Sequence, residues 1–152
     1  MDWRQKVASL NKLLLALDTG PQSELLIKRV CQLYSHAVKQ LEVVHVVRQG
    51  LHDAQLLQMD SCSSVHPPRI DDYLAIKIRE MLRRNGLNVS SDKIHLVRGE
   101  PAYEIKKLAK MLAVDLVIIG SHCPENNWVS LPGATTNCVI QGVSSDVMAV
   151  KI

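Results

Sequence analysis

The chain has 152 residues and a formal net charge of +3, from 18 basic and 15 acidic side chains. This length is typical of one domain, and folding buries roughly 70% of the surface of the unfolded chain, enough for a hydrophobic core. The nearly balanced charge favours neither nucleic acid nor a membrane as a partner. We expect no signal peptide, because the first apolar run, LLLALD, is too short to span a bilayer.

The cysteines carry no recognisable metal or disulfide pattern. The chain has no CxxC pair and no metal-ligand spacing among Cys31, Cys62, Cys123 and Cys138. We therefore expect a reducing compartment, which indicates a cytoplasmic protein, and no bound metal. Cys31 and Cys138 lie within apolar stretches and are predicted to be small core residues.

The first part of the chain predicts two strands separated by a helix. KLLLALD, residues 12–18, is a short apolar run that predicts a buried strand, and the β-branched run LEVVHVV, residues 41–47, predicts a second. Residues 22–40 between them have a helical pattern. Their apolar face consists of Leu26, Val30, Leu33 and Ala37. Residues 48–68 contain no clear element, and a loop of this length is uncommon unless it is functional or mobile.

The middle of the chain predicts two further helices around a third strand. Residues 70–85 form the first of these helices, and Gly86 suits its end because glycine adopts the left-handed cap conformation. Its apolar stripe consists of Ile70, Leu74, Ile78, Met81 and Leu82. KIHLV, residues 93–97, predicts the strand. The next helix opens at Pro101, since proline suits a first helical turn. Its apolar stripe consists of Ile105, Leu108, Ala109 and Leu112.

The last part completes an alternating pattern. DLVIIG, residues 115–120, predicts a fourth strand, residues 135–140 a short helix, and DVMAVKI, residues 146–152, a fifth strand. Strands that alternate with helices imply an α/β fold, with a mainly parallel five-stranded sheet and four helices on its two faces. We place this domain at residues 12–152, after a leader at 1–11.

Such a sheet binds ligands beyond the carboxyl ends of its strands, where the strand order reverses. Residues 18–20, 45–47 and 120–122 are expected at this edge. Asp18 fits two roles equally: it could bond to the ribose or base of a nucleotide, or cap the turn. His45 is expected to be a packing residue at the end of its strand.

A loop bounded by glycines follows the fourth strand. Residues 120–136 read GSHCPENNWVSLPGATT and lead into a short helix, which is the general layout of a phosphate cradle. There is no lysine beside the second glycine and no GxGxxG, so the pattern alone is a weak indication. Adjacent His122 and Cys123 lack an orienting third group, which makes catalysis there the weaker interpretation.

Two groups of basic residues lie on predicted helices. They are Arg79, Arg83 and Arg84, and Lys106, Lys107 and Lys110. Such groups are usually solvated helix faces, and no aromatic residues interleave with them. We therefore expect no binding to nucleic acid.

Four segments together resemble the universal stress protein family: KLLLALD, LEVVHVV, RGEPAYEIKKLAKMLAVDLVIIGSH and VMAVKI. Ser23 also matches a serine that follows the first acidic turn in many members. The resemblance covers about residues 12–152. It implies a three-layer Rossmann-like sandwich in a cytoplasmic protein that often forms a homodimer through the last strand.

The last strand is apolar and is expected at an edge of the sheet, where an unpaired strand is a template for pairing. A dimer would cover it, and the leader is the alternative cover. The candidate dimer residues are Val147, Met148, Ala149 and Val150.

Family members that bind ATP resemble the pattern Gly-x2-Gly-x9-Gly-Ser/Thr. This chain keeps the spacing with Gly120 and Gly133, but Cys123 replaces the second glycine and Ala134 replaces the hydroxyl residue. The prolines at 124 and 132 also remove two N–H donors. The threonines at 135 and 136 offer hydroxyl groups only from shifted positions.

We therefore expect a non-catalytic stress-response homodimer with a degenerate nucleotide loop, which acts through unknown protein partners. The alternative function is binding of ATP or another adenine nucleotide. A less favoured alternative is a thiol-based redox module at Cys123. The nucleotide-binding candidates are Asp18, Thr19, Val46, Gly120, Ser121, Cys123, Gly133, Ala134, Thr135 and Thr136.

Overall fold

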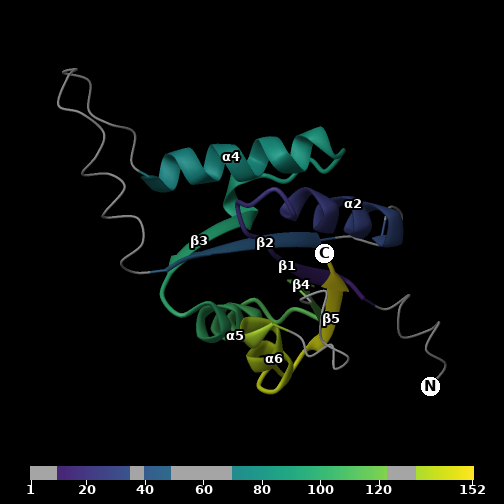
Figure 1. Ribbon diagram of the computed structural model, residues 1–152, viewed down its shortest axis with the longest axis vertical. Coiled ribbons are helices and arrows are strands. Elements are labelled where there is room, and N and C mark those ends of the chain that lie inside the picture. The colour runs from purple at the N-terminus through teal and green to yellow at the C-terminus, as the bar shows by residue number, and fades with distance from the viewer. Residues whose placement is uncertain (1–9, 35–39, 49–69, 123–132) are drawn as a thin grey trace.

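A five-stranded sheet lies between two layers of helices in the computed structural model (Figure 1). The structure describes residues 10–34, 40–48, 70–122 and 133–152. The strands are β1 (Lys12–Ala16), β2 (Gln40–Val47), β3 (Ile94–Arg98), β4 (Leu116–Ser121) and β5 (Asp146–Lys151). They lie in the order β3-β2-β1-β4-β5, and every neighbouring pair is parallel. The predicted α/β fold is confirmed, and its sheet is wholly parallel in this part of the chain.

The helices cover the sheet in pairs. The helices are α2 (Ser23–Tyr34), α4 (Ile70–Arg84), α5 (Pro101–Met111) and α6 (Ala134–Ile140), with a short 3-10 turn, η1, at Ser91–Lys93. Figure 1 shows α2 and α4 above the sheet and α5 and α6 below it. Among the described residues, no helix combines the length and apolar character that a membrane span requires.

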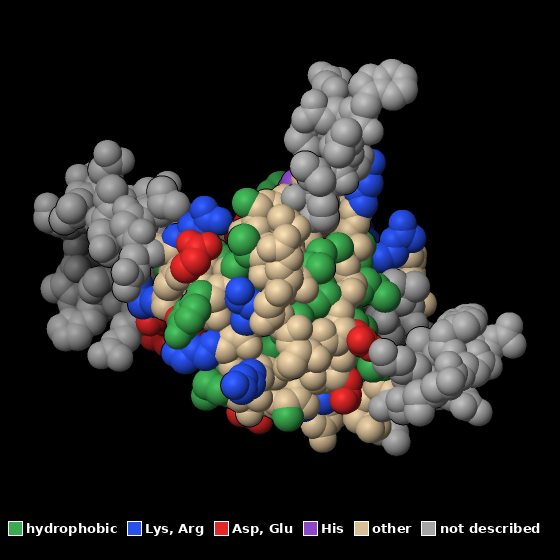
Figure 2. All heavy atoms as spheres, turned by 90° about the horizontal axis from the view of Figure 1, so that it is seen from below, with side chains coloured by type: hydrophobic (Ala, Val, Ile, Leu, Met, Phe, Trp, Pro, Cys, Tyr) green, Lys and Arg blue, Asp and Glu red, His purple; other side chains and the backbone are tan. Residues whose placement is uncertain are grey.

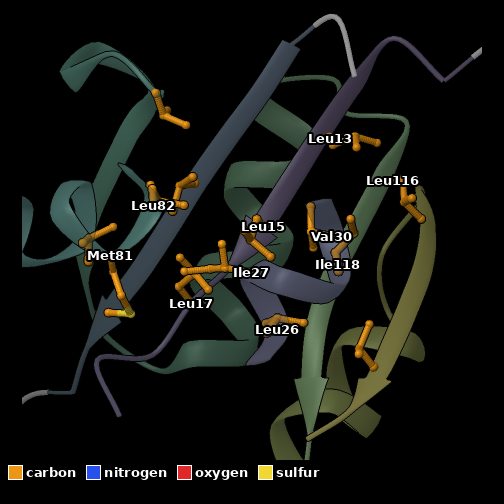
Figure 3. Packing of buried hydrophobic residues seen from close by; sticks show 14 residues of the cluster. Leu13, Leu15, Leu17, Leu26, Ile27, Val30, Met81, Leu82, Leu116 and Ile118 are labelled. Atoms are coloured by element: carbon orange, nitrogen blue, oxygen red, sulfur yellow. The ribbon is translucent and has the colours of Figure 1, made fainter. Parts of the chain in front are cut away.

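The strand side chains divide between two cores because successive residues of a strand point to opposite faces. Leu13, Leu15 and Leu17 pack on one face against α2 and α4, where Figure 3 shows them beside Leu26 and Leu82. The other face packs under α5 and α6. Its buried residues include Leu14, Ala16, Val44, Ile105, Ala109, Val117 and Val139. The predicted helix stripes therefore point into these cores wherever their side chains are described.

Two predicted helix boundaries have clear physical causes. Gly86 has φ of +85°, its N–H donates to Arg83 O at 3.0 Å, and the Leu87 N–H donates to Leu82 O at 3.0 Å. These two bonds form the Schellman motif that ends α4. Pro101 occupies the first turn of α5, as expected.

The predicted end of the first helix, at Gln40, is wrong. Gln40 begins β2, where it pairs with Lys12 of β1, and the described part of α2 ends at Tyr34. Pairing with β1 outweighs a helical pattern in this polar stretch. Ala37 lies outside the described residues. Of the loop predicted at 48–68, only Arg48 is described, and it is exposed after the end of β2.

The prediction for the cysteines holds for one residue and fails for another. Cys31 is half-buried, packs against the α2–α4 core, and donates from Sγ to Asn85 O at 3.3 Å. Cys138 is exposed, which contradicts its prediction as a core residue. The inward face of α6 consists of Thr136 and Val139, three residues apart, and this spacing turns Cys138 toward solvent.

One buried charge ties three strands together at the end of the sheet opposite the ligand edge. Glu42 of β2 is 7% exposed; its Oε2 lies 2.8 Å from Nε2 of His95 on β3, and its Oε1 lies 3.7 Å from Nζ of Lys12 on β1. A buried carboxylate needs such partners because its desolvation is costly. No described buried side-chain polar atom lacks a hydrogen-bond partner.

We predict that Gly86→Ala lowers the free energy of unfolding by about 1 kcal/mol, because alanine is strained at positive φ. Gly86→Asn should cost roughly half as much, since asparagine tolerates this conformation. No atom lies near the position of an added Cβ, so a steric clash is not the cause. Urea unfolding of the three proteins measures the difference. Equal stability of all three would contradict the assignment of Gly86 as a left-handed cap.

We predict that Glu42→Ala destabilises the fold by about 2–3 kcal/mol, because it leaves a half-buried histidine and lysine without their carboxylate. The matched control is the Arg98–Asp71 pair, which has the same 2.8 Å separation but is about half exposed. Arg98→Ala should cost about 0.5 kcal/mol or less. Thermal and urea unfolding would test this, and similar losses for both variants would show that burial does not set the value of the Glu42 cluster.

Candidate functional site

The strand order reverses between β1 and β4, and their carboxyl ends lie side by side. Ala16 of β1 is in register with Ile119 of β4. The turn that follows β1 leads into α2, and Gly120 to His122 follow at the end of β4. An open parallel sheet presents its ligand site at such a switch point. The described members of the predicted nucleotide set are therefore gathered around one edge of the sheet.

The turn after β1 is organised by Asp18. The Asp18 side chain is exposed, and its Oδ1 accepts a hydrogen bond of 2.7 Å from the Thr19 N–H. Gly20 O then accepts from the N–H of the buried Ser23, the first residue of α2. The capping role foreseen for Asp18 is thus present. An exposed carboxylate that already accepts one bond still has acceptor sites for a ligand, so both predicted roles remain compatible with the geometry.

The end of β2 contributes a packed residue and a half-buried one. His45 is 5% exposed, and its Nδ1 lies 2.9 Å from Leu17 O, so its predicted packing role is confirmed. Val46 is half-buried and packs against the α5–α6 core. The next carbonyl, Val47 O, accepts from the Gly99 N–H at 3.1 Å. That bond fixes the turn before α5 at the same edge.

Gly120 lacks a side chain for a reason that the sequence pattern does not predict. A Cβ on Gly120 would lie 2.4 Å from Cδ1 of Ile152 and 3.5 Å from Cδ2 of Leu26. A side chain at position 120 would therefore displace the Ile152 side chain. This packing is a second reason for glycine there, beside the predicted close approach of the backbone to phosphate.

Gly133 is a different case. Its φ is −51°, which any residue adopts, and only His122 O, at 4.0 Å, would lie near an added Cβ. It is the N-cap of α6 and provides no side-chain cap. Neither backbone conformation nor packing among the described residues requires glycine at this position. Among the described residues, only His122 O lies within 4.0 Å of the position of a Cβ on Gly133.

The hydroxyl groups near the start of α6 point into the fold. Thr136 is 3% exposed, and its Oγ1 donates to Gly120 O at 3.1 Å. Thr135 is half-buried, Ser121 is buried, and Ala134 is exposed without a hydroxyl group. Thr136 thus stabilises the contact between α6 and β4, which removes the role of a shifted phosphate ligand predicted for it. Cys123 and the prolines at 124 and 132 lie outside the described residues.

The described residues provide little chemistry beyond hydrogen bonding. They contain no group of three side chains able to hold a metal ion. Burial raises the pKa of the Cys31 thiol, which keeps it protonated at neutral pH and suits its role as a donor to Asn85 O. This cysteine is therefore an unsuitable nucleophile.

A groove beside the switch point was missed by reasoning from the sequence. It has a volume of about 470 Å³ and lies between the start of α2 and the side of α4. Its lining includes Thr19, Gly20, Glu24, Tyr73, Ile76, Lys77, Glu80 and Arg84. Tyr73 and Ile76 are 59% and 52% exposed, and both lie off the apolar stripe of α4. Apolar residues outside the stripe are the signal that could have indicated this surface.

Comparison with known proteins decides the family. The model of the universal stress protein family matches residues 9–151. The chain belongs to this family. Universal stress protein A homolog 2 of Coxiella burnetii is 29% identical over 148 residues, which cover 93% of this chain and 94% of that protein. Universal stress protein A homolog 1 of the same organism is 24% identical over 140 residues, which cover 91% of this chain and 94% of that protein.

Solved structures agree with the fold of the family. A universal stress protein solved in complex with cAMP is 16% identical, with a TM-score of 0.62 over 93% of this chain and 97% of that one. A universal stress protein from Archaeoglobus fulgidus is 16% identical, with a TM-score of 0.60 over 98% of both chains. At such identities the likeness concerns the fold, and it confirms the predicted Rossmann-like architecture.

We predict that Gly120→Ala destabilises the protein by about 1–3 kcal/mol through the clash with Ile152. In the Ile152→Val background, which lacks the nearest atom, the same substitution should cost less. Gly133→Ala is the matched control and should change the free energy of unfolding by about 0.5 kcal/mol or less. The described atom nearest to its Cβ is His122 O at 4.0 Å. A double-mutant cycle by urea unfolding measures the coupling. Additive effects at positions 120 and 152 would contradict the packing explanation for Gly120.

Proposed function

We propose that this chain is a non-catalytic binding and regulatory member of the universal stress protein family, with a nucleotide loop that holds triphosphate weakly. The start of α6 carries the argument. Ala134 has no hydroxyl group at the position where the pattern of ATP-binding members has Ser or Thr. The Thr136 hydroxyl already donates to Gly120 O. The first turn of α6 therefore offers a phosphate no described hydroxyl group except the half-buried Thr135.

The lost contacts are large enough to matter. A hydrogen bond to a charged phosphate contributes roughly 1.5–3 kcal/mol. Replacing the second glycine by Cys123 also places a side chain where the backbone would approach the anion. Two losses of this size lower affinity by about a hundredfold to about ten-thousandfold. On this view the protein acts in the cytoplasm through contacts with other molecules and not through turnover.

Homodimerisation through β5 is part of this proposal. β5 lies at the edge of the sheet and pairs only with β4 among the described strands. Val147 and Met148 are half-buried, Val150 is buried and Ala149 is exposed. An edge strand with apolar residues is protected by pairing with another chain. A second copy of the protein would supply that pairing.

The second candidate function is binding of an adenine nucleotide at the same edge. Gly133 favours it, since neither its backbone conformation nor its packing against the described residues explains a glycine there. Asp18 is exposed and would meet a ribose, with Thr19, the backbone at Val46 and the end of β4 beside it. A structural neighbour is described as a complex with cAMP. A nucleotide with fewer phosphates makes less use of the altered loop than ATP does.

The proposal is tested by restoring the family pattern. Nucleotide-free wild-type protein should show no micromolar binding of ATP by isothermal titration, whereas Cys123→Gly/Ala134→Ser should gain at least about tenfold in affinity. Asn137→Ser, which adds a hydroxyl group on the exposed side of α6, is the matched control and should gain nothing. AMP and cAMP are titrated in parallel.

Micromolar ATP binding by the wild type would reject the weak-loop proposal and support the adenine-nucleotide alternative. Binding of AMP or cAMP together with Asp18→Asn sensitivity would locate that ligand at the β1 turn. No gain in the restored variant, with its fold intact by circular dichroism, would show that residues 123 and 134 do not control the loop.

A further inference from the structure

The outer side of α5 carries a continuous stripe of basic and apolar side chains. Residues three, four, seven and eight apart share one face of a helix. The stripe consists of Tyr103, Lys106, Lys107, Lys110 and Met111. Tyr103 is 61% exposed and Met111 is 71% exposed. The inward stripe of the same helix is buried against the sheet, so these outward residues are not needed for the core.

α6 extends this surface without adding charge. Its sequence, ATTNCVI, has no ionisable residue other than the exposed Cys138, and Ile140 is 44% exposed. The half-buried Lys106 reaches the turn that follows α6, because its Nζ lies 2.8 Å from where a Cβ on Gly142 would be. We call the α5 stripe together with Ile140 the α5–α6 face. Figure 2 views this side of the molecule, where basic side chains lie among hydrophobic ones.

The charge on this face is of one sign. Glu104 is the one carboxylate within α5; its side chain is 16% exposed, and it lies 3.7 Å from Lys107 Nζ. Within the described ranges, Lys106 and Lys110 have no carboxylate at ion-pair distance. Lys107 Nζ also lies 6.0 Å from the centre of the Tyr103 ring. The face therefore has a net positive charge, with Lys107 beside an exposed aromatic ring and Lys106 and Lys110 without a described carboxylate partner.

The basic cluster on α4 shows what a solvated face looks like in the same protein. Arg84 pairs with Glu80, and Arg79 donates to Ser91 Oγ at 3.2 Å. On α4 the exposed Tyr73 and Ile76 also lie beside basic residues, but carboxylates accompany them, because Glu24 and Glu80 line the same groove. On α5, by contrast, Glu104 is the one carboxylate beside three lysines.

We propose that the α5–α6 face is a docking surface for an acidic segment of another protein, with carboxylates that pair with the three lysines and apolar side chains that cover Tyr103, Met111 and Ile140. Charge complementarity selects the carboxylates, and the exposed apolar residues supply area that a purely ionic contact would leave uncovered. A nucleic acid fits less well, because three lysines on one helix offer few phosphate contacts and Tyr103 is the single aromatic ring among the residues that define this face. This surface is separate from the candidate nucleotide residues and does not depend on their function.

The test measures fluorescence anisotropy with the full chain and short fluorescein-labelled peptides. The main probe alternates Glu or Asp with Leu and Trp. A second peptide has Ser in place of the apolar residues, a third has Lys in place of the acids, and a labelled oligothymidine represents nucleic acid. We expect the first peptide to bind most tightly, with an affinity that falls as salt is raised.

Matched variants assign the binding to a face. Lys106→Glu/Lys107→Glu/Lys110→Glu should weaken binding of the acidic, apolar peptide by at least about tenfold. Arg79→Glu/Arg83→Glu/Arg84→Glu changes the net charge equally on α4 and should leave the affinity within about twofold. Tyr103→Ala/Met111→Ala should weaken the first peptide but not the Ser-containing one.

Several results would overturn the proposal: no binding of the first peptide, equal loss in the two charge-reversed proteins, equal affinity for the Ser-containing peptide, or tighter binding of oligothymidine. If a charge-reversed protein fails to fold, a second measurement takes its place. The first peptide is added to the wild type, and the changes in its amide chemical shifts are recorded. Shifts confined to α5 and the end of α6 support the proposal, and shifts elsewhere, or none, contradict it.

Discussion

The burial of β1 on both faces constrains the rest of the structure. Leu13, Leu14 and Leu15 are at most 1% exposed, and they belong alternately to the cores under α2–α4 and α5–α6. A strand of this kind must be central, with a neighbour on each side and helices above and below. The chain meets this requirement by placing β2 on one side and, after crossing over, β4 on the other. That crossing creates the switch point, so the candidate site follows directly from the way β1 is buried.

The sequence predicts the fold well where the indication is a local hydrophobic periodicity or a glycine or proline with a specific backbone conformation. Apolar β-branched runs predict the strands, Gly86 predicts its helix end through its positive φ, and Pro101 predicts a helix start. The sequence predicts element boundaries poorly where pairing between strands overrides the local preference of the chain, as at Gln40. The exposure of Cys138 was missed because α6 is too short for its inward face to be clear from apolar spacing.

The candidate site is harder to predict from the sequence than the fold, because a glycine in the sequence does not show why a side chain is absent at that position. Gly120 and Gly133 look alike in the loop pattern. Gly120 packs closely against Ile152, a contact between distant parts of the chain that no local pattern can reveal, whereas Gly133 has no close contact among the described residues. Thr136 presents the same ambiguity, since only the structure shows that its hydroxyl group is used internally. Family spacing therefore locates the loop, whereas packing decides which of its residues can face a ligand.

These internal contacts bear on how a member of this family could lose a ligand and keep its fold. The bond from Thr136 to Gly120 O and the packing of Ile152 against Gly120 hold α6 and the chain end against β4 without help from a phosphate. Because these contacts do not involve the side chain of Ala134, a substitution at that exposed position should cost the fold little. The same helix layer presents its outer side, where Lys107, Lys110 and Tyr103 are exposed and belong to neither core. The proposed binding at the sheet edge and the proposed docking on the helix face use different residues, so either could change without the other.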